Sequence, residues 1–320
     1  MRRWLRPDHR SRLASATGIV CLDCGDVLVG RSHECDNPAW VRRLPCCSDP
    51  AFDVSASSGE IDAEVRRRLR SGDPLYQIHS DLIRALRPDL VITQMHCDVC
   101  AVTAADVGRT GACALDARQI ALSTSSIGGI FDSIRLVARA LDVEERGEDL
   151  VRREQRRLEV VAEKTARFSR KSVGMIEWTD PVFLMANWAP ELIETANGEP
   201  VLGRQGEYSI AIDGNELLEF DPEYLIIAPC GFNLERSLAE QSRLERYPWW
   251  AQLQAVRSGK VAFADGNLFF NRGGMTIAQS AEIVAEILHG VRFHESHGIH
   301  WRSMGTAAGE SARQLMEGAF

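Results

Sequence analysis

The sequence contains no run close to the ~20 consecutive apolar residues that a membrane-spanning helix needs. It also lacks an excess of positive charge, because 45 acidic residues outnumber 37 basic ones and the net charge is −8 at pH 7. A basic face is what attracts a phosphate backbone, so nucleic acid is not expected as a partner. The basic N-terminal segment is not followed by the apolar stretch of a secretory signal, and we therefore expect a cytoplasmic protein.

Catalytic sequence motifs are missing as well. The sequence has no P-loop, no nucleophile elbow and no Ser-His-Asp order, and spacing alone nominates no acid–base pair. An enzyme is therefore not the first expectation, although an enzyme that uses a metal cluster stays open as an alternative. What is present is a globular composition, with 45% hydrophobic and 26% charged residues over 320 positions, enough for two α/β domains.

The hydrophobic pattern divides the chain into four parts. Residues 13–142 alternate short apolar runs with helical patterns, which is typical of βαβ units and a mostly parallel sheet. One long amphipathic helix is predicted over residues 143–168, and a second α/β lobe over residues 169–290. No apolar period continues over residues 291–320, so we expect a loose tail there.

A weak internal repeat links the two α/β regions. Residues 87–93, RPDLVIT, match residues 221–227, DPEYLII, and each copy is typical of a helix end, a proline next to an acidic residue, and a buried strand. Further strands are predicted over residues 27–30, 172–177 and 260–263. Because open α/β sheets bind ligands at the carboxyl ends of their strands, we expect the loops after both copies to line one cleft.

Four segments resemble the cobalamin- and iron-siderophore-binding proteins of ABC importers. They are residues 28–38 (LVGRSHECDNP), residues 86–92, residues 180–183 and the long helix, and their order spans nearly the whole chain. The resemblance implies two Rossmann-like lobes with mostly parallel sheets, joined by one long interdomain helix, with a small-molecule or metal-chelate ligand between them. Members of that family are normally exported, but no secretory signal is found in this sequence, so we expect a cytoplasmic member.

Nine cysteines, an odd number, indicate thiols or thiolate ligands in a reducing compartment rather than a disulfide framework. Cys97 and Cys100 have the CxxC spacing, which suits one metal ion or adjacent corners of an iron–sulfur cluster. Cys35 follows the predicted strand at residues 27–30, and Cys230 lies in the loop after the second repeat copy. These four are predicted to hold an iron–sulfur cluster. Zinc, cobalamin, and cysteines that serve only as small hydrophobic residues are the alternatives.

Eight further residues are predicted to line the cleft beside the metal centre. The histidines could replace one thiolate or donate a hydrogen bond to it, the aromatic rings suit a large planar ligand, and the arginine could meet an anionic group. Ordinary polar contacts and core packing are the alternatives. The residues are His33, Glu34, His96, Glu177, Trp178, Trp188, Phe232 and Arg272.

The remaining cysteines carry no clear metal-site pattern. Cys21 and Cys24 also have the CxxC spacing, but they fall on the first predicted helix and at its end, where packing is favoured. Cys46, Cys47 and Cys113 have no partner that the sequence can name. The prediction therefore concerns a binding or carrier protein with one cysteine-rich site and no identified protein partner.

Overall fold

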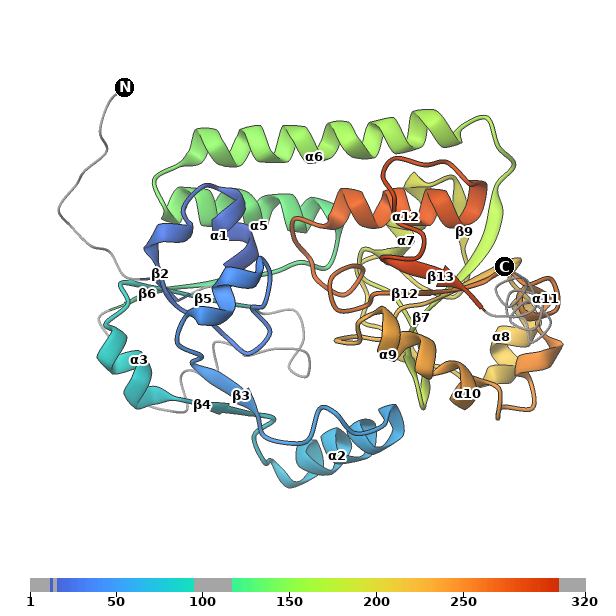
Figure 1. The fold of residues 1–320 in the computed structure, drawn as a ribbon, viewed down its shortest axis with the longest axis horizontal. Coiled ribbons are helices and arrows are strands. Elements are labelled where there is room, and N and C mark those ends of the chain that lie inside the picture. The colour runs from blue at the N-terminus through green and yellow to red at the C-terminus, as the bar shows by residue number, and fades with distance from the viewer. Residues whose placement is uncertain (1–11, 14–15, 95–116, 305–320) are drawn as a thin grey trace, which may run out of the picture. The chain divides into compact units, whose positions relative to one another are not determined.

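The computed structural model describes residues 12–13, 16–94 and 117–304. The chain forms two compact units, unit 1 (Met1–Arg153) and unit 2 (Glu154–Phe320). Each unit combines parallel strands with helices, which confirms the predicted α/β class (Figure 1).

The long helix predicted over residues 143–168 is α6 (Glu144–Thr165), and the chain passes from unit 1 to unit 2 within it. Gly147 does not interrupt this helix. A Cβ atom at Gly147 would lie only 2.4 Å from Cβ of Ala138 in α5 (Ile127–Ala140), so the glycine lets the two helices pack closely. Charged residues recur along α6, and no helix in the described part of the chain is both long and apolar enough to cross a bilayer.

Unit 1 is built on a sheet of four parallel strands in the order β2-β1-β5-β6. The strands are β1 (Arg12–Leu13), β2 (Leu28–Gly30), β5 (Leu90–Gln94) and β6 (Arg118–Leu122). Strand β5 is buried from Leu90 to Thr93, which agrees with its unbroken apolar sequence and its inner position. Helices α1 (Ala16–Cys21) and α3 (Ser80–Leu86) complete this part of unit 1 together with α5.

A small separate sheet also belongs to unit 1. Strands β3 (Ser48–Pro50) and β4 (Tyr76–Ile78) pair antiparallel, and the chain between them forms α2 (Ser58–Ser71) (Figure 1). Helix α2 begins at a capping box, in which the Ser57 side chain accepts from the Glu60 backbone and the Glu60 side chain accepts from the Ser57 backbone. Its apolar side is buried through Ile61 and Val65, whereas Arg66, Arg67 and Arg70 are exposed.

Unit 2 contains a seven-stranded mixed sheet. Its order is β10-β8-β7-β11-β12-β13, and β9 pairs with the first part of β7. Strands β7, β9, β11 and β12 run parallel, whereas β8, β10 and β13 pair antiparallel with their neighbours. The strands are β7 (Lys171–Thr179), β8 (Val182–Leu184), β9 (Gly198–Pro200), β10 (Ile210–Ala211), β11 (Tyr224–Ile227), β12 (Val261–Ala264) and β13 (Trp301–Ser303).

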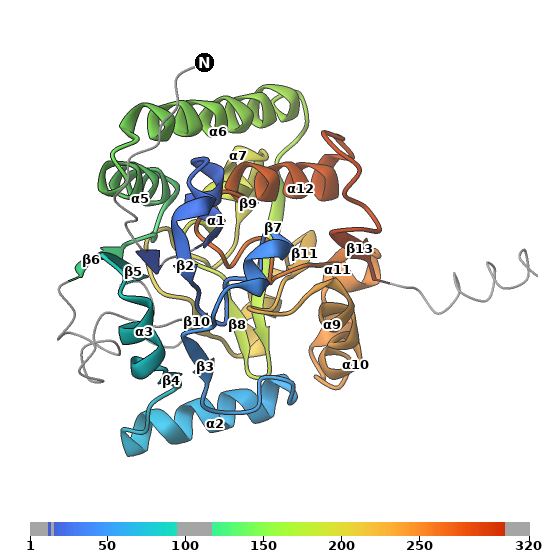
Figure 2. The same cartoon turned by 60° about the vertical axis from the view of Figure 1, so that its left-hand side comes forward.

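Helices and a large apolar core surround this sheet. Helix α12 packs against α7, and Figure 2 shows the two side by side. The core joins strand residues such as Ile176 and Phe263 to Leu217 of α8 and to Trp249 and Trp250. The helices are α7 (Ala189–Thr195), α8 (Gly214–Phe220), α9 (Leu234–Ala239), α10 (Gln241–Leu244), α11 (Gln254–Arg257) and α12 (Ile277–His289).

The internal repeat is confirmed and is longer than the sequence indicates. Helices α3 and α8 stand in the same place before the two copies, and each ends at a residue with positive φ, Arg87 (44°) or Asp221 (37°). A proline follows each cap, and then comes the inner parallel strand, β5 or β11. Each unit therefore contains one copy of the same helix–proline–strand module.

The segment after Val291 differs from the expected loose tail. Strand β13 pairs antiparallel with β12, and the Trp301 indole donates to the buried carboxylate of Glu286 at 3.1 Å. Sequence periodicity misses this strand because it is three residues long and only Trp301 is buried. Residues 305–320 lie outside the described part of the chain.

Candidate functional site

The loop after β2 carries Cys35, the first predicted ligand. Its Sγ atom lies 3.3 Å from Oγ of Ser32, and its backbone N–H donates to the Ser32 carbonyl at 3.2 Å. These two contacts form a tight turn close to the carboxyl end of the strand. A hydroxyl beside a sulfur can stabilise a thiolate by hydrogen bonding, so the surroundings of Cys35 suit a metal ligand.

His33 and Glu34, two predicted neighbours of the site, lie in the same turn. The His33 ring stacks on Tyr76 with 5.0 Å between centroids, and its Nδ1 lies 2.9 Å from Oγ of Ser48. Its Nε2 lies 3.7 Å from a carboxylate oxygen of Glu34. Burial lowers the pKa of His33 below its ordinary 6.5, and this outweighs the opposing charge of Asp49. The lowered pKa favours the neutral form of His33. The contact between its Nδ1 and Oγ of Ser48 anchors the turn.

Two other cysteines of unit 1 are packing residues. Cys47 is 2% exposed, and burial raises the pKa of its thiol to about 11. Its Sγ lies 3.7 Å from the Pro45 carbonyl, and Sγ of Cys46 donates to the Ser48 carbonyl at 3.2 Å. The Cys47 thiol, which burial keeps protonated, is a poor metal ligand, since metals bind the thiolate.

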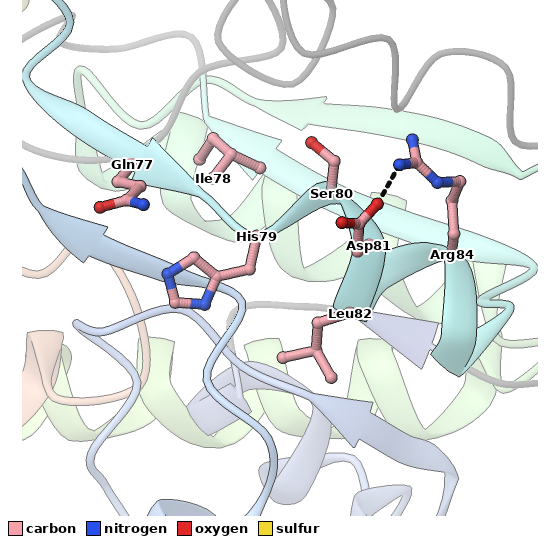
Figure 3. Close-up of a pocket in the computed structure, with 7 residues that line it drawn as sticks. All are labelled: Gln77, Ile78, His79, Ser80, Asp81, Leu82 and Arg84. Atoms are coloured by element: carbon pink, nitrogen blue, oxygen red, sulfur yellow. Dashed lines mark hydrogen bonds and ion pairs between the residues drawn. The ribbon is translucent and has the colours of Figure 1, made fainter.

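Unit 1 also contains an open hollow of about 590 Å³ that the sequence does not indicate (Figure 3). His79 connects it to the small sheet, with Nδ1 3.2 Å from the Cys46 carbonyl and Nε2 3.1 Å from the Asp49 carboxylate. Most of its lining is polar, unlike the mostly apolar walls of a typical ligand pocket, so we assign it no function. It is lined by Gln77, Ile78, His79, Ser80, Asp81, Leu82 and Arg84.

In unit 2, Cys230 lies in the loop that follows β11, close to its carboxyl end. Its backbone N–H donates to the Glu177 carbonyl on β7 at 3.0 Å, and its thiol is free and partly exposed. The next residue, Gly231, has φ of +76°, a conformation that favours glycine. The parallel sheet therefore presents Cys230 where strand ends of open α/β sheets bind ligands.

Glu177 lies beside this loop at an irregularity in β7. The pairing of β7 with β8 shifts register between Ile176 and Trp178, which places an extra residue at this point. Ser209 donates to the Glu177 carboxylate and also accepts the backbone N–H of Ala186 at 3.1 Å. Burial raises the pKa of Glu177, and the Ser209 hydrogen bond opposes the shift. Glu177 thus ties the segment before β10 to the end of β7.

Aromatic and basic side chains surround the same strand ends. Trp178 packs edge-on against Phe232 with 5.2 Å between centroids, and the guanidinium of Arg236 lies 3.6 Å from the centre of the Phe232 ring. Arg272 donates to Oδ1 of Asn267 at 2.7 Å. Glu177, Trp178, Phe232 and Cys230 lie near the carboxyl ends of β7 and β11, and their role as lining of a ligand site stays a prediction.

Trp188 differs from its predicted role. It precedes α7 and is only 5% exposed, so it belongs to the apolar core of unit 2 rather than to a ligand-facing surface. The sequence leaves this choice open because a tryptophan next to a helix start suits either role. Phe232 likewise differs from its predicted role, because it is 2% exposed and is a packing residue of the Cys230 loop rather than part of a ligand-facing surface.

Three predicted site residues, His96, Cys97 and Cys100, lie outside the described residues, as does Cys113. Cys35 belongs to unit 1 and Cys230 to unit 2, so the four-cysteine set stays a prediction. Across residues 16–94 and 117–304, no cluster of three or more His, Cys, Asp or Glu side chains is arranged to hold a metal ion.

Three polar residues that hold the predicted site residues or the loops that carry them were not predicted. Ser32 contacts the Cys35 thiol, Ser209 holds Glu177, and Asn271 holds the loop of Cys230. A turn-forming sequence, GNLFFNRGG, marks the neighbourhood of Asn271, but serine and asparagine are common in every loop. Only the tertiary structure distinguishes these three from other loop residues.

A family model described as periplasmic binding protein matches residues 70–268, well over half of the chain. The chain belongs to this family. The match spans the second half of the β3–β4 region, the repeated modules and most of unit 2, and it confirms the resemblance drawn from the sequence. No curated protein sequence matches the chain at a significant level.

Solved structures of periplasmic binding proteins share the fold. A periplasmic heme binding protein from Pseudomonas aeruginosa is 15% identical, covering 93% of this chain and 98% of its own, with a TM-score of 0.70. An ABC transporter substrate-binding protein from Listeria monocytogenes is 16% identical, covering 88% and 100%, with a TM-score of 0.66. The periplasmic vitamin B12 binding protein of Vibrio cholerae is also 16% identical, covering 88% and 98%, with a TM-score of 0.64. Identities this low show the fold and leave the ligand of this chain to other arguments.

Proposed function

We propose that this periplasmic binding protein homologue holds a metal centre, an iron–sulfur cluster, through Cys35, Cys97, Cys100 and Cys230. The observation that carries the proposal is that Cys35 and Cys230 each lie in a loop close to the carboxyl end of a parallel strand, β2 in unit 1 and β11 in unit 2. Cys97 and Cys100 follow β5 in the sequence and supply a CxxC pair. Four thiolates are the usual ligand set of such clusters.

The chemistry of the described donors fits this ligand set. Ser32 offers a hydroxyl to the Cys35 sulfur, and Cys230 combines a free, partly exposed thiol with a fixed backbone. Cys47, with its pKa raised to about 11, has the opposite surroundings. When bound, a cluster supplies electron transfer or an iron atom that a small molecule can coordinate. The protein supplies the thiolate ligands and controls the access of small molecules to the cluster.

The proposal includes a reducing compartment, the cytoplasm. Cys46, Cys47 and Cys230 are free thiols in this structure, which supports that location. Disulfides are rare in the cytosol and common in exported domains. Counting thiols in freshly lysed and alkylated cells tests it, and a majority of paired cysteines would contradict it.

A metal chelate such as cobalamin or heme is the second candidate ligand. It is favoured by the names of the structural relatives and by the partly exposed side chains of Trp178 and Arg236 at the strand ends of unit 2. Aromatic faces and cationic groups suit a planar ligand with acidic substituents. In that case the cysteines would provide at most one axial ligand.

Anaerobic purification with a visible spectrum and iron, zinc and cobalt analysis distinguishes these candidates. An iron–sulfur protein is brown, with broad thiolate-to-iron absorption, whereas a corrinoid protein is red and a zinc protein colourless. We expect iron with acid-labile sulfide in the wild type, and loss of most of it in Cys230→Ser. Cys46→Ser is the matched control and should retain the iron. A wild type that holds no iron after anaerobic reconstitution would disprove the cluster.

A further inference from the structure

The loop that presents Cys230 is held by a neighbouring loop of unit 2, which follows β12. The side-chain amide of Asn271 donates to two backbone carbonyls, Ala228 at 2.9 Å and Gly266 at 2.8 Å. Ala228 immediately follows β11, so this bridge fixes the start of the Cys230 loop against the loop after β12. An amide has two N–H groups, and both are used here.

Close backbone packing reinforces the bridge. A Cβ atom at Gly266 would lie 2.2 Å from the Pro229 carbonyl oxygen and 2.6 Å from the carbonyl carbon of Ala228. Backbone cannot move aside as a flexible side chain can, so only glycine allows the two loops to approach this closely. Asn271 therefore bridges two loops that already lie in close contact through Gly266, Ala228 and Pro229.

Hydrogen bonds fix the rest of the loop on both sides. The N–H of Cys230 donates to the Glu177 carbonyl at 3.0 Å, and the N–H of Asn267 donates to the Phe232 carbonyl at 2.9 Å. Phe232 in turn donates to the Pro229 carbonyl at 3.0 Å, which makes the loop a closed turn. Cys230 therefore sits on a backbone tied to β7 and to the loop after β12.

We infer that Asn271 is a positioning residue for Cys230, which holds the thiol in its ligating place before any metal binds. The inference rests on the proposed function, since it assigns Cys230 the role of ligand. A ligand held in advance lowers the conformational entropy lost on binding, and the groups that hold it are part of the site. Asn271 acts on the Cys230 loop through its hydrogen bonds to the carbonyls of Ala228 and Gly266 and through the packing at Gly266.

Unit 2 offers a matched control for this arrangement. Asn197 also donates through Nδ2 to two backbone carbonyls, Thr165 at 3.1 Å and Phe168 at 2.9 Å, at the end of α6. It has the same bonding pattern as Asn271, and its partners precede β7 rather than follow β11. A role limited to stability predicts the same consequences for both residues.

The test compares Asn271→Asp with Asn197→Asp. An ionised aspartate has nearly the shape of asparagine, but it cannot donate and it sets negative oxygens against two carbonyls. Both variants should lose thermal stability to a similar degree. In the metal-free protein, only Asn271→Asp should speed alkylation of Cys230, by about fivefold, as read from that peptide by mass spectrometry. Faster amide hydrogen exchange over residues 228–232 should accompany it.

Asn271→Ser keeps one donor and should give an intermediate rate, which preserves the test if the aspartate variant does not fold. Equal alkylation of Cys230 in wild type, Asn271→Ser and Asn197→Asp would overturn the inference. Iron content separates it from the proposed function. If Asn271→Asp speeds alkylation while the wild type never binds iron, the positioning stands and the cluster fails. If the wild type binds iron and Asn271→Asp binds as much, positioning does not matter for ligation.

Discussion

Unit 1 and unit 2 contain the same short module, a seven-residue helix, a residue with positive φ, a proline and an inner parallel strand. Their surroundings differ. In unit 2 the module lies in a seven-stranded sheet above a core with three tryptophan or phenylalanine side chains, Trp249, Trp250 and Phe263. In unit 1 it lies in a four-stranded sheet whose outer strand β2 has only three residues.

The same contrast holds for the loops at the strand ends. The loop after β11 is fixed by Gly266, Asn271 and β7, whereas the turn after β2 depends on Ser32 and on the His33–Ser48 contact. The turn after β2 and the loop after β11 are therefore held by different kinds of contact. The neighbouring elements decide how firmly each cysteine is held.

The first and largest test truncates equivalent residues of the two modules. Leu217 of α8 and Ile83 of α3 occupy the same position, with exposures of 0% and 2%. We expect Leu217→Ala to lower the free energy of unfolding by about 4 kcal/mol and Ile83→Ala by about 3 kcal/mol, because Leu217 belongs to the larger core. Urea unfolding measures both changes. A greater loss for Ile83→Ala would contradict the view that unit 2 has the stronger core.

A second test compares ion pairs. In unit 2, Arg157 holds the buried carboxylates of Glu282 (2.8 Å) and Glu154 (3.1 Å). Removing it as Arg157→Ala leaves two buried charges without this partner and should cost about 3 kcal/mol. In unit 1, Arg135 pairs with the more exposed Glu148, and Arg135→Ala should cost less than about 1 kcal/mol. Thermal unfolding of both variants would show equal losses if burial did not matter.

Helix caps give a smaller effect that should be the same in both units. Ser57 begins α2 of unit 1 and Asp213 begins α8 of unit 2, each in a complete capping box. Replacing either by alanine should lower the free energy of unfolding by about 1 kcal/mol, because backbone N–H groups of the first turn lose their acceptor. Urea midpoints measure the two changes. A clear difference between them would show that tertiary contacts, rather than local bonding, set the value of these caps.

The smallest effect concerns acid sensitivity. Burial lowers the pKa of His33 in unit 1 and of His300 in unit 2, so the folded protein binds fewer protons than the unfolded chain. Stability from this source is complete above pH 6.5, the ordinary value, and decreases as the pH falls below it. His33→Asn keeps a polar atom near Ser48 but cannot titrate.

The variant His33→Asn should therefore lose less stability between pH 7.5 and 5.5 than the wild type does. Melting temperatures at the two values provide the measurement. His300→Asn should reduce the remaining loss in the same way through unit 2. If His33→Asn keeps the full pH dependence of the wild type, the conclusion that burial lowers the pKa of His33 would be wrong.

Several features of the fold follow directly from the sequence. The unbroken apolar run at residues 90–92 determines a buried strand, since such a run has no polar face to turn to solvent. The heptad-like spacing over residues 143–168 determines α6, and the serine and glutamate at positions 57 and 60 determine where α2 begins. Each of these features depends on residues within a few positions of one another along the chain, so a local sequence pattern is enough to predict it.

The features left to the tertiary structure depend on distant residues. Whether Trp188 lines a surface or fills a core, whether Val291 begins a loose tail or leads to β13, and whether Asn271 supports Cys230 are decided by segments far away in sequence. Gly266 is one glycine among 25 in the sequence. The need for glycine at this position is visible only in the structure, where a Cβ atom would collide with the Pro229 carbonyl oxygen. The sequence by itself thus determined the modules and the candidate cysteines, whereas packing within each unit decided how Cys35 and Cys230 are held.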